Sequence, residues 1–176
     1  ISDFSKLMRT VLNNSNNPTI TLADEIKSLE IYMSLEHSRF EDKFDYEIVI
    51  DQDLNSGEIE VPPMLIQPYV ENAVWHGLRY RETIGFLLLH IAQKGSKLIA
   101  TIEDNGIGRT KSQKLKTAHQ QDYKSTGIAN TKERIRLLNK LHGENFSVVI
   151  TDLEKDEVAQ GTRVEIEMPL NTKVYA

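Results

Sequence analysis

The chain has 176 residues, enough for one large domain with a full hydrophobic core. Its 21 basic and 26 acidic residues give a net charge of −5, which argues against a nucleic-acid-binding surface. The absence of cysteine excludes a disulfide framework, a thiolate nucleophile and a thiolate metal site. No apolar run in the sequence approaches the roughly 18 residues that a membrane span needs, and no signal peptide is recognisable.

The first part of the chain is expected to be helical. It opens without methionine, directly in a helical pattern, so we expect a segment of a longer protein. Apolar residues at helical spacing predict a helix over residues 4–11, followed by an Asn-rich breaker at 13–18. Thr21 and Asp24 then resemble a capping box, which predicts a second helix that ends at about Phe40.

From residue 45 the apolar period changes to two, which predicts β-strands. Strands are expected at residues 46–50, 86–91, 97–104, 146–150 and 164–168, with helices from about Pro68 and over 128–141. Residues 105–126 are polar and lack convincing periodicity, so they are expected to form a lid loop. Adjacent late strands favour antiparallel pairing. The predicted fold is therefore a two-layer α/β (α+β) sandwich, with a mixed, mostly antiparallel sheet and helices on one face.

One predicted helix carries an amide and an imidazole in the run IQPYVENAVWHGL, residues 66–78. Asn72 and His76 are one helical turn apart, so they are expected on the same face. An amide oxygen is a suitable hard ligand for Mg²⁺, which keeps most of its waters and bridges phosphates. The alternative is that Asn72 is a structural or exposed helix residue.

A carboxylate followed by two glycines ends the strand at 97–104. Asp104 falls on the apolar face of that strand by simple alternation, where it needs a hydrogen-bond donor to offset its desolvation. An adenine amine would be such a donor, and Gly106 and Gly108 would allow close approach of a ligand. The alternative is an ordinary Asp-Asn-Gly turn. Taken together, the helix-borne amide and the strand-end acid favour an ATP site.

Other signals are weaker. Gly127 begins the helix at 128–141 and could offer backbone N–H groups to a phosphate, although a plain helix start explains it equally. Thr162 could support the carboxylate or simply open the last strand. The lid lysines are expected mainly to solvate the loop: Lys111, Lys114, Lys116 and Lys124. Four histidines show no metal-ligand or catalytic spacing: His37, His90, His119 and His142.

The ordered motifs ENA-x-x-HG, DNGIG, TGIAN and GTRVEIEMP resemble the N, G1, G2 and final-strand boxes of the GHKL ATPase/kinase superfamily. Within it, the runs LEIYMSLEHSRFEDKFDYEIVID and EVPPMLIQPYVENAVWHGL resemble the LytS-like sensor histidine kinases. The resemblance implies a GHKL histidine-kinase ATPase-like fold that binds ATP and Mg²⁺ and transfers the γ-phosphoryl to a histidine.

The resemblance also implies roles for individual residues. Asn72 would coordinate Mg²⁺, Asp104 would accept from the adenine amine, and Thr162 would stand behind the adenine. The implied ATP-binding residues are Asn72, His76, Asp104, Gly106, Gly108, Gly127 and Thr162.

At the level of the whole protein, the resemblance implies a catalytic domain over residues 41–176, with its lid at 105–126. Residues 1–40 would be the end of the helical dimerisation and phosphoacceptor region. The full-length protein would be a homodimeric sensor in a bacterial inner membrane, with this domain in the cytoplasm. Its partner would be a response regulator, of a LytTR type, and the domain itself would bind no nucleic acid.

Three departures from the family pattern are evident. The acceptor motif Asn-Pro-His-Phe is absent, so the phosphorylated histidine would lie upstream of Ile1. Trp75 occupies the position three after Asn72, where histidine kinases often carry Lys or Arg. The stretch from Ser125 to Asn130 has fewer glycines than the usual G2 box, which predicts a stiffer lid or weaker ATP binding.

Two alternatives remain open. A GHKL ATPase clamp is disfavoured because Pro68 stands where those relatives carry the Glu that activates water, and Glu71 points about 100° away from Asn72. A non-catalytic nucleotide-binding, dimerisation or relay module is disfavoured by the retained Asn72 and Asp104, but Trp75 and the glycine-poor G2 box are compatible with it.

Overall fold

The computed structural model describes residues 17–40, 43–115, 126–143, 145–155 and 158–170. The helix predicted at residues 4–11 lies outside these ranges. The described elements follow in the order β1 (Ile20–Thr21), α2 (Leu22–Arg39), β2 (Phe44–Ile50), β3 (Glu60–Val61), α3 (Gln67–Asn72), η1 (Ala73–Leu78), β4 (Gly85–Lys94), β5 (Lys97–Asp104), α4 (Arg109–Leu115), α6 (Thr126–His142), β6 (Ser147–Lys155) and β7 (Val158–Pro169).

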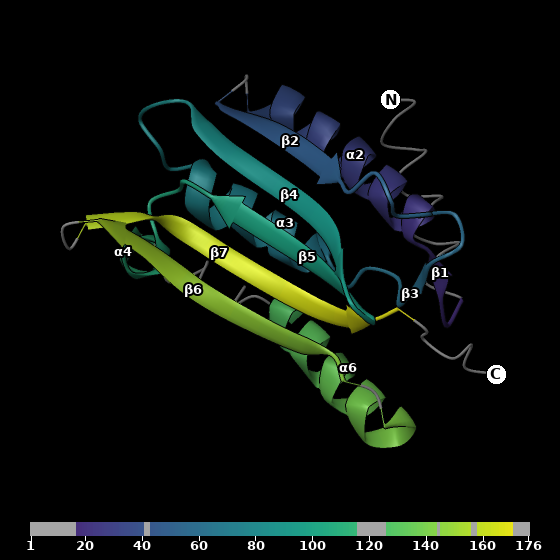
Figure 1. Cartoon of the computed structure of the whole chain (residues 1–176). Coiled ribbons are helices and arrows are strands. Elements are labelled where there is room, and N and C mark those ends of the chain that lie inside the picture. Colours follow the sequence, from purple (N-terminus) through teal and green to yellow (C-terminus); the bar gives the residue numbers. More distant parts are fainter. Residues whose placement is uncertain (1–16, 41–42, 116–125, 144, 156–157, 171–176) are drawn as a thin grey trace.

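The main sheet has five strands in the order β2-β4-β5-β7-β6. Strand β2 runs parallel to β4, and the other three pairings are antiparallel. Helices α2, α3 and α6 lie on one face of this sheet, and none of the described helices covers the opposite face (Figure 1). The two-layer sandwich with a mixed, mostly antiparallel sheet is therefore confirmed.

Strict alternation along the strands divides the two faces of the sheet. In β5, the even-numbered residues Leu98, Ala100 and Ile102 are buried under the helices, and Asp104 continues the same row. Asp104 pairs in register with Thr162 of β7, so both side chains lie on the helix-covered face at the same end of the sheet. This register puts a carboxylate and a hydroxyl at the end of an apolar layer.

Helix α2 begins at the predicted cap. The Thr21 hydroxyl accepts a hydrogen bond from the Asp24 backbone N–H at 3.1 Å and donates to the Asp24 carboxylate at 2.8 Å. The inner face of α2 packs into the same hydrophobic cluster as the sheet, through Leu22, Ile26, Leu29, Tyr32 and Met33. The predicted division at residue 40 therefore coincides with no break in the core.

The predicted lid needs one correction. Residues 105–126 were expected to form a loop, but α4 occupies Arg109–Leu115 within that range. The segment has no apolar stripe because α4 is short and buries only Ser112, so hydrophobic periodicity could not reveal it. None of the described helices is long and apolar enough to cross a membrane.

Candidate functional site

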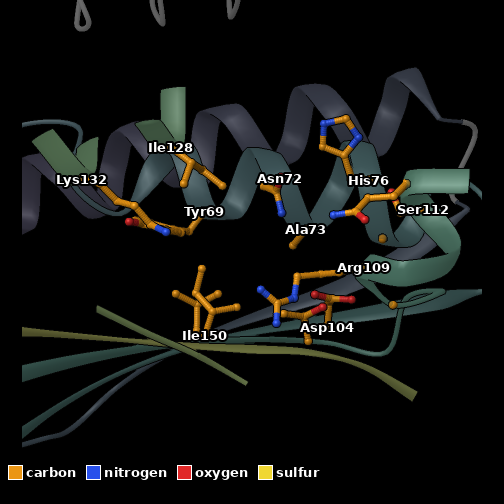
Figure 2. A pocket seen from close by; sticks show the side chains of 15 residues that line it. Tyr69, Asn72, Ala73, His76, Asp104, Arg109, Ser112, Ile128, Lys132 and Ile150 are labelled. Carbon is orange, nitrogen blue, oxygen red and sulfur yellow. The ribbon is translucent and has the colours of Figure 1, made fainter. Parts of the chain in front are cut away.

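A cavity of about 210 Å³ lies between the helical layer and the inner face of β5, β6 and β7. Helices α3 and η1 form one wall, α4 closes one end, and the first turns of α6 form the other side (Figures 1 and 2). The lining residues are Tyr69, Asn72, Ala73, His76, Gly77, Asp104, Gly108, Arg109, Ser112, Gln113, Ile128, Lys132, Ile150, Thr162 and Val164. The lining combines apolar side chains with a few polar groups, as in a small-molecule site.

Asp104 is the buried acid of this cavity. Its side chain is only 4% exposed, and one carboxylate oxygen accepts a hydrogen bond from the Gly106 backbone N–H at 2.8 Å. Burial raises the pKa of Asp104 to about 6, against the opposing effects of the Gly106 and Thr162 backbone N–H groups and of the Arg81 charge. A carboxylate in this setting is stabilised by any further donor that enters the cavity.

Glycines surround this carboxylate closely. A Cβ on Gly77 would lie 2.8 Å from an Asp104 carboxylate oxygen, and a Cβ on Gly106 would lie 2.5 Å from the Cα of Gly77. Gly161 has a φ of 130°, and a Cβ there would lie 1.8 Å from the Asp104 carbonyl oxygen. No other residue fits these positions without a backbone shift, so the acid is held by backbone packed against backbone.

Asn72 is the last residue of α3, and the helix widens directly after it. Residues Ala73–Leu78 form a π-helix, and the Arg79 N–H bonds to the Val74 carbonyl at 3.0 Å, five residues back. The side chain of Asn72 points toward Arg109 and Asp104, whereas the His76 ring points away from Asp104 (Figure 2). Both line the cavity, as the prediction of a shared site requires, although the segment that carries His76 is a π-helix and not the expected α-helix.

Some of the other predicted residues line the cavity and some do not. Gly108 and Thr162 line the cavity, so five of the seven predicted residues do so. Gly106 lies beneath the Asp104 carboxylate rather than at the wall. Gly127 is exposed and is not among the lining residues, whereas its neighbour Ile128 is. The ligand roles of all seven residues stay predictions.

Five polar lining residues were missed by the sequence analysis: Tyr69, Arg109, Ser112, Gln113 and Lys132. The Tyr69 and Ser112 hydroxyls are buried and have no hydrogen-bond partner among the described residues, and an unpaired buried hydroxyl of this kind calls for an explanation. The position of Arg109, directly after Gly108, was the available sequence signal. Lys132 had no signal beyond its place on the helix that follows Gly127.

The described lid lysines are exposed, as expected, and a different cation lines the cavity. Lys111 and Lys114 are exposed and do not line the cavity, while Lys116 and Lys124 lie outside the described residues. Arg109 instead reaches across to β6, where its guanidinium bonds both carboxylate oxygens of Asp152 at 2.6 Å. This pair fastens the start of α4 to the edge of the sheet.

Trp75 faces α2 and not the cavity. Its ring lies edge-on to Phe40 at 5.3 Å between centroids, and the Arg39 and Arg79 guanidinium carbons lie 4.8 and 5.1 Å from its centroid. The unusual residue at this position therefore supports the contact between η1 and α2 and does not obstruct the cavity.

The comparisons with solved structures agree with the architecture. The histidine kinase domain of the blue-light-activated kinase from Erythrobacter litoralis EL346 matches with a TM-score of 0.54 at 17% identity, over 97% of this chain and 74% of that one. The catalytic domain of the histidine kinase ThkA matches with a TM-score of 0.54 at 13% identity, over 86% of this chain and 95% of that one. The fold is that of a histidine kinase catalytic domain.

The sequence comparisons narrow this class. Sensor protein LytS of Oceanobacillus iheyensis is 31% identical over 89% of this chain, and LytS of Streptococcus mutans is 31% identical over 96%. The sensor histidine kinase YpdA of Escherichia coli is 27% identical over 84% of this chain. A family model described as "Histidine kinase" matches residues 1–44. The chain belongs to the LytS-like sensor histidine kinases, and it spans about a quarter of the length of these relatives (27%, 28% and 25%).

Proposed function

We propose that this chain binds ATP with Mg²⁺ and acts as the catalytic domain that transfers the γ-phosphoryl to a histidine upstream of Ile1 in a longer sensor kinase. The observation that carries this proposal is the buried carboxylate of Asp104, 4% exposed at the end of the cavity and enclosed by Gly77 and Gly106. A flat base can approach this acid closely because no side chain of these glycines intervenes.

Individual residues would hold the nucleotide as follows. Asp104 would accept a hydrogen bond from the adenine amine, with Thr162 behind it in register. The Asn72 amide oxygen would hold Mg²⁺, a hard cation that carboxylate and amide oxygens suit. Lys132 and Arg109 would offset phosphate charge at the rim.

The donor set of the cavity fits this ligand. The Tyr69 and Ser112 hydroxyls lack partners among the described residues, and the cations Arg109 and Lys132 also line the cavity. Bound Mg²⁺ would neutralise phosphate charge, and the domain itself would contribute position and a prearranged electrostatic environment.

A hydrolytic clamp is less well supported. Glu71 is the only carboxylate adjacent to Asn72 in the sequence, but one of its oxygens accepts a hydrogen bond from the Gln67 amide at 2.8 Å. Glu71 is also not among the residues that line the cavity. No described residue of the cavity wall other than Asp104 carries a carboxylate that could activate water.

For the whole protein we propose the arrangement expected of a sensor kinase. The upstream region would supply the phosphoacceptor histidine and the dimer interface, and a cytoplasmic response regulator of LytTR type would receive the phosphoryl group. The domain would lie on the cytoplasmic side of a bacterial inner membrane. We also propose that the lid reaches from residue 105 to 126, with α4 as its first turns.

Calorimetric titration of this chain with a non-hydrolysable ATP analogue, with and without Mg²⁺, tests the proposal. We expect binding that is stronger with Mg²⁺ and is lost in Asp104→Asn, because an amide presents an N–H₂ group where the adenine amine needs an acceptor. Asp53→Asn makes the same chemical change at an exposed site and should bind like the wild type. Absence of wild-type binding at millimolar nucleotide would favour a relay module instead.

A further inference from the structure

A second buried carboxylate lies outside the cavity. Glu25 of α2 is 1% exposed, and its two oxygens accept hydrogen bonds from the backbone N–H groups of Met64, at 2.9 Å, and Ile66, at 3.4 Å. These residues belong to the loop that leads directly into α3. One side chain of α2 therefore holds the segment from which the Asn72 helix begins.

The loop at residues 62–66 depends on contacts from other parts of the chain to hold its conformation. Met64 has a φ of 56°, in the left-handed region that a residue with a side chain seldom adopts. Pro62 and Pro63 have no N–H group, so they cannot donate hydrogen bonds that would fix the loop from within. A strained backbone of this kind persists only where its surroundings determine it, and the Glu25 carboxylate supplies that constraint.

Arg134 of α6 joins the same network. Its guanidinium donates a hydrogen bond to the Pro63 carbonyl. Burial raises the pKa of Glu25, and the loop N–H groups and the charge of Arg134 act against that rise. Burial likewise lowers the pKa of Arg134, and the charge of Glu25 opposes this. The charge of the partly buried Arg134 therefore favours ionised Glu25 across the loop, and the reverse also holds.

The network connects α3 and α6, two helices that contribute to different parts of the cavity wall. Helix α3 begins one residue after Ile66 and carries Tyr69 and Asn72, both in the cavity wall. Helix α6 carries Ile128 and Lys132 in the opposite part of the wall, and Arg134 follows two residues later. Asp104 lies apart from this network, held by β5 and the glycines of η1 and the following turn.

We propose that Glu25 and Arg134 are positioning residues that set the placement of α3 against α6, and thereby the binding of the Mg²⁺–triphosphate end of the nucleotide. The inference rests on the proposed function. In this arrangement, β5 and the nearby glycines hold the part of the cavity that binds adenine. Glu25 and Arg134 hold the part that binds the phosphates. A residue that only stabilised the fold would affect both ends alike.

The test compares two ligands, adenosine and the Mg²⁺ complex of a non-hydrolysable ATP analogue, on the 176-residue chain. We expect Glu25→Gln and Arg134→Met to weaken binding of the Mg²⁺–nucleotide by about tenfold, the usual effect of losing a charged hydrogen bond. Binding of adenosine should change by less than about twofold in both variants. For the Mg²⁺–nucleotide, the double variant should lose less binding free energy than the sum of the losses in the two single variants, because both residues act through the same loop.

Matched controls lie on the same helices. Glu30→Gln on α2 and Arg136→Met on α6 change exposed residues of the same kinds and should leave both ligands unaffected. Thermal unfolding followed by circular dichroism identifies the temperature at which each variant is folded. Should Glu25→Gln not fold, Arg134→Lys supplies the same comparison, since it keeps the charge but not the guanidinium geometry.

The outcomes separate the two proposals. Folded variants that bind both ligands like the wild type, or that lose both equally, would overturn the positioning role and leave the proposed function intact. A wild type that binds neither ligand would overturn the proposed function and this inference with it. Selective loss of the Mg²⁺–nucleotide supports the positioning role.

Discussion

At the scale of single residues, the buried carboxylate of Asp104 carries a cost in stability when it is ionised. Its carboxylate is enclosed by backbone and retains few donors, so ionisation in the folded state is unfavourable until a ligand arrives. A residue with a pKa shifted by burial inside a cavity is typical of a functional site. The cost is expected to appear in the pH dependence of stability.

Burial raises the pKa of Asp104 from 3.8 to about 6 in the folded chain, so the folded state binds the proton more tightly than the unfolded state. The contribution of Asp104 to stability is therefore complete below pH 4 and is lost as the pH rises to about 6. We expect Asp104→Asn to become more stable relative to the wild type by about 2 kcal/mol between pH 4 and pH 7.

Urea denaturation of both proteins at pH 4, 5, 6 and 7 measures this difference. Comparison of the two proteins removes the contribution of other titrating groups, including Glu25 and Glu36, whose pKa values burial also raises. A difference that does not change with pH would show that the folded chain does not hold Asp104 protonated.

At the scale of elements, the cavity depends on a contact between two backbones. The π-helix η1 brings Gly77 against Gly106 in the turn after β5, and the Ile107 N–H bonds to the Gly77 carbonyl at 3.3 Å. A π-turn offsets the helix by one residue, which is frequent at functional sites. Here it sets Gly77 over the carboxylate.

Gly77→Ala tests this contact. Its new Cβ would lie 2.8 Å from the Asp104 carboxylate oxygen, so η1 or the turn must shift. We expect a loss of about 1–3 kcal/mol in unfolding free energy, in the range of overpacked cores. Gly57→Ala is the control, because its Cβ would meet no atom closer than 3.7 Å. Equal stability of the two variants in urea would contradict the close packing.

At the scale of the whole molecule, α2 is part of the core beneath the sheet. Its buried face and the inner residues of β2, β4 and β5 belong to one hydrophobic cluster. Trp75 and Glu25 add contacts from α2 to η1 and to the loop before α3. We therefore expect the folded unit to include β1 and α2 and not to begin at residue 41.

Leu29→Ala examines this expectation. Leu29 is 0% exposed on α2, and its truncation in a shared core should cost about 2–5 kcal/mol in unfolding free energy. Leu137→Ala on α6 removes the same atoms at a position that is 42% exposed and should cost far less. A loss below about 1 kcal/mol for Leu29→Ala would show that α2 contributes little to the stability of the domain.

The sequence by itself determined the strands, the sandwich and the strand-end acid. Alternation of period two identifies β5 and β7 without knowledge of their partners, and it already assigns Asp104 to the apolar face. The Thr21 cap of α2 likewise involves residues only three positions apart in the chain. These features depend on residues near each other in the chain, so their pattern can be read directly.

Only the tertiary structure decided which side chains meet in the cavity. Arg109, Lys132 and Tyr69 come from three elements whose spacing along the chain carries no sign of their meeting. The π-helix at Ala73–Leu78 has no apolar period that marks it. The burial of α2 depends on which surface covers its apolar stripe, and a stripe has the same pattern whether it faces a second helix or a sheet.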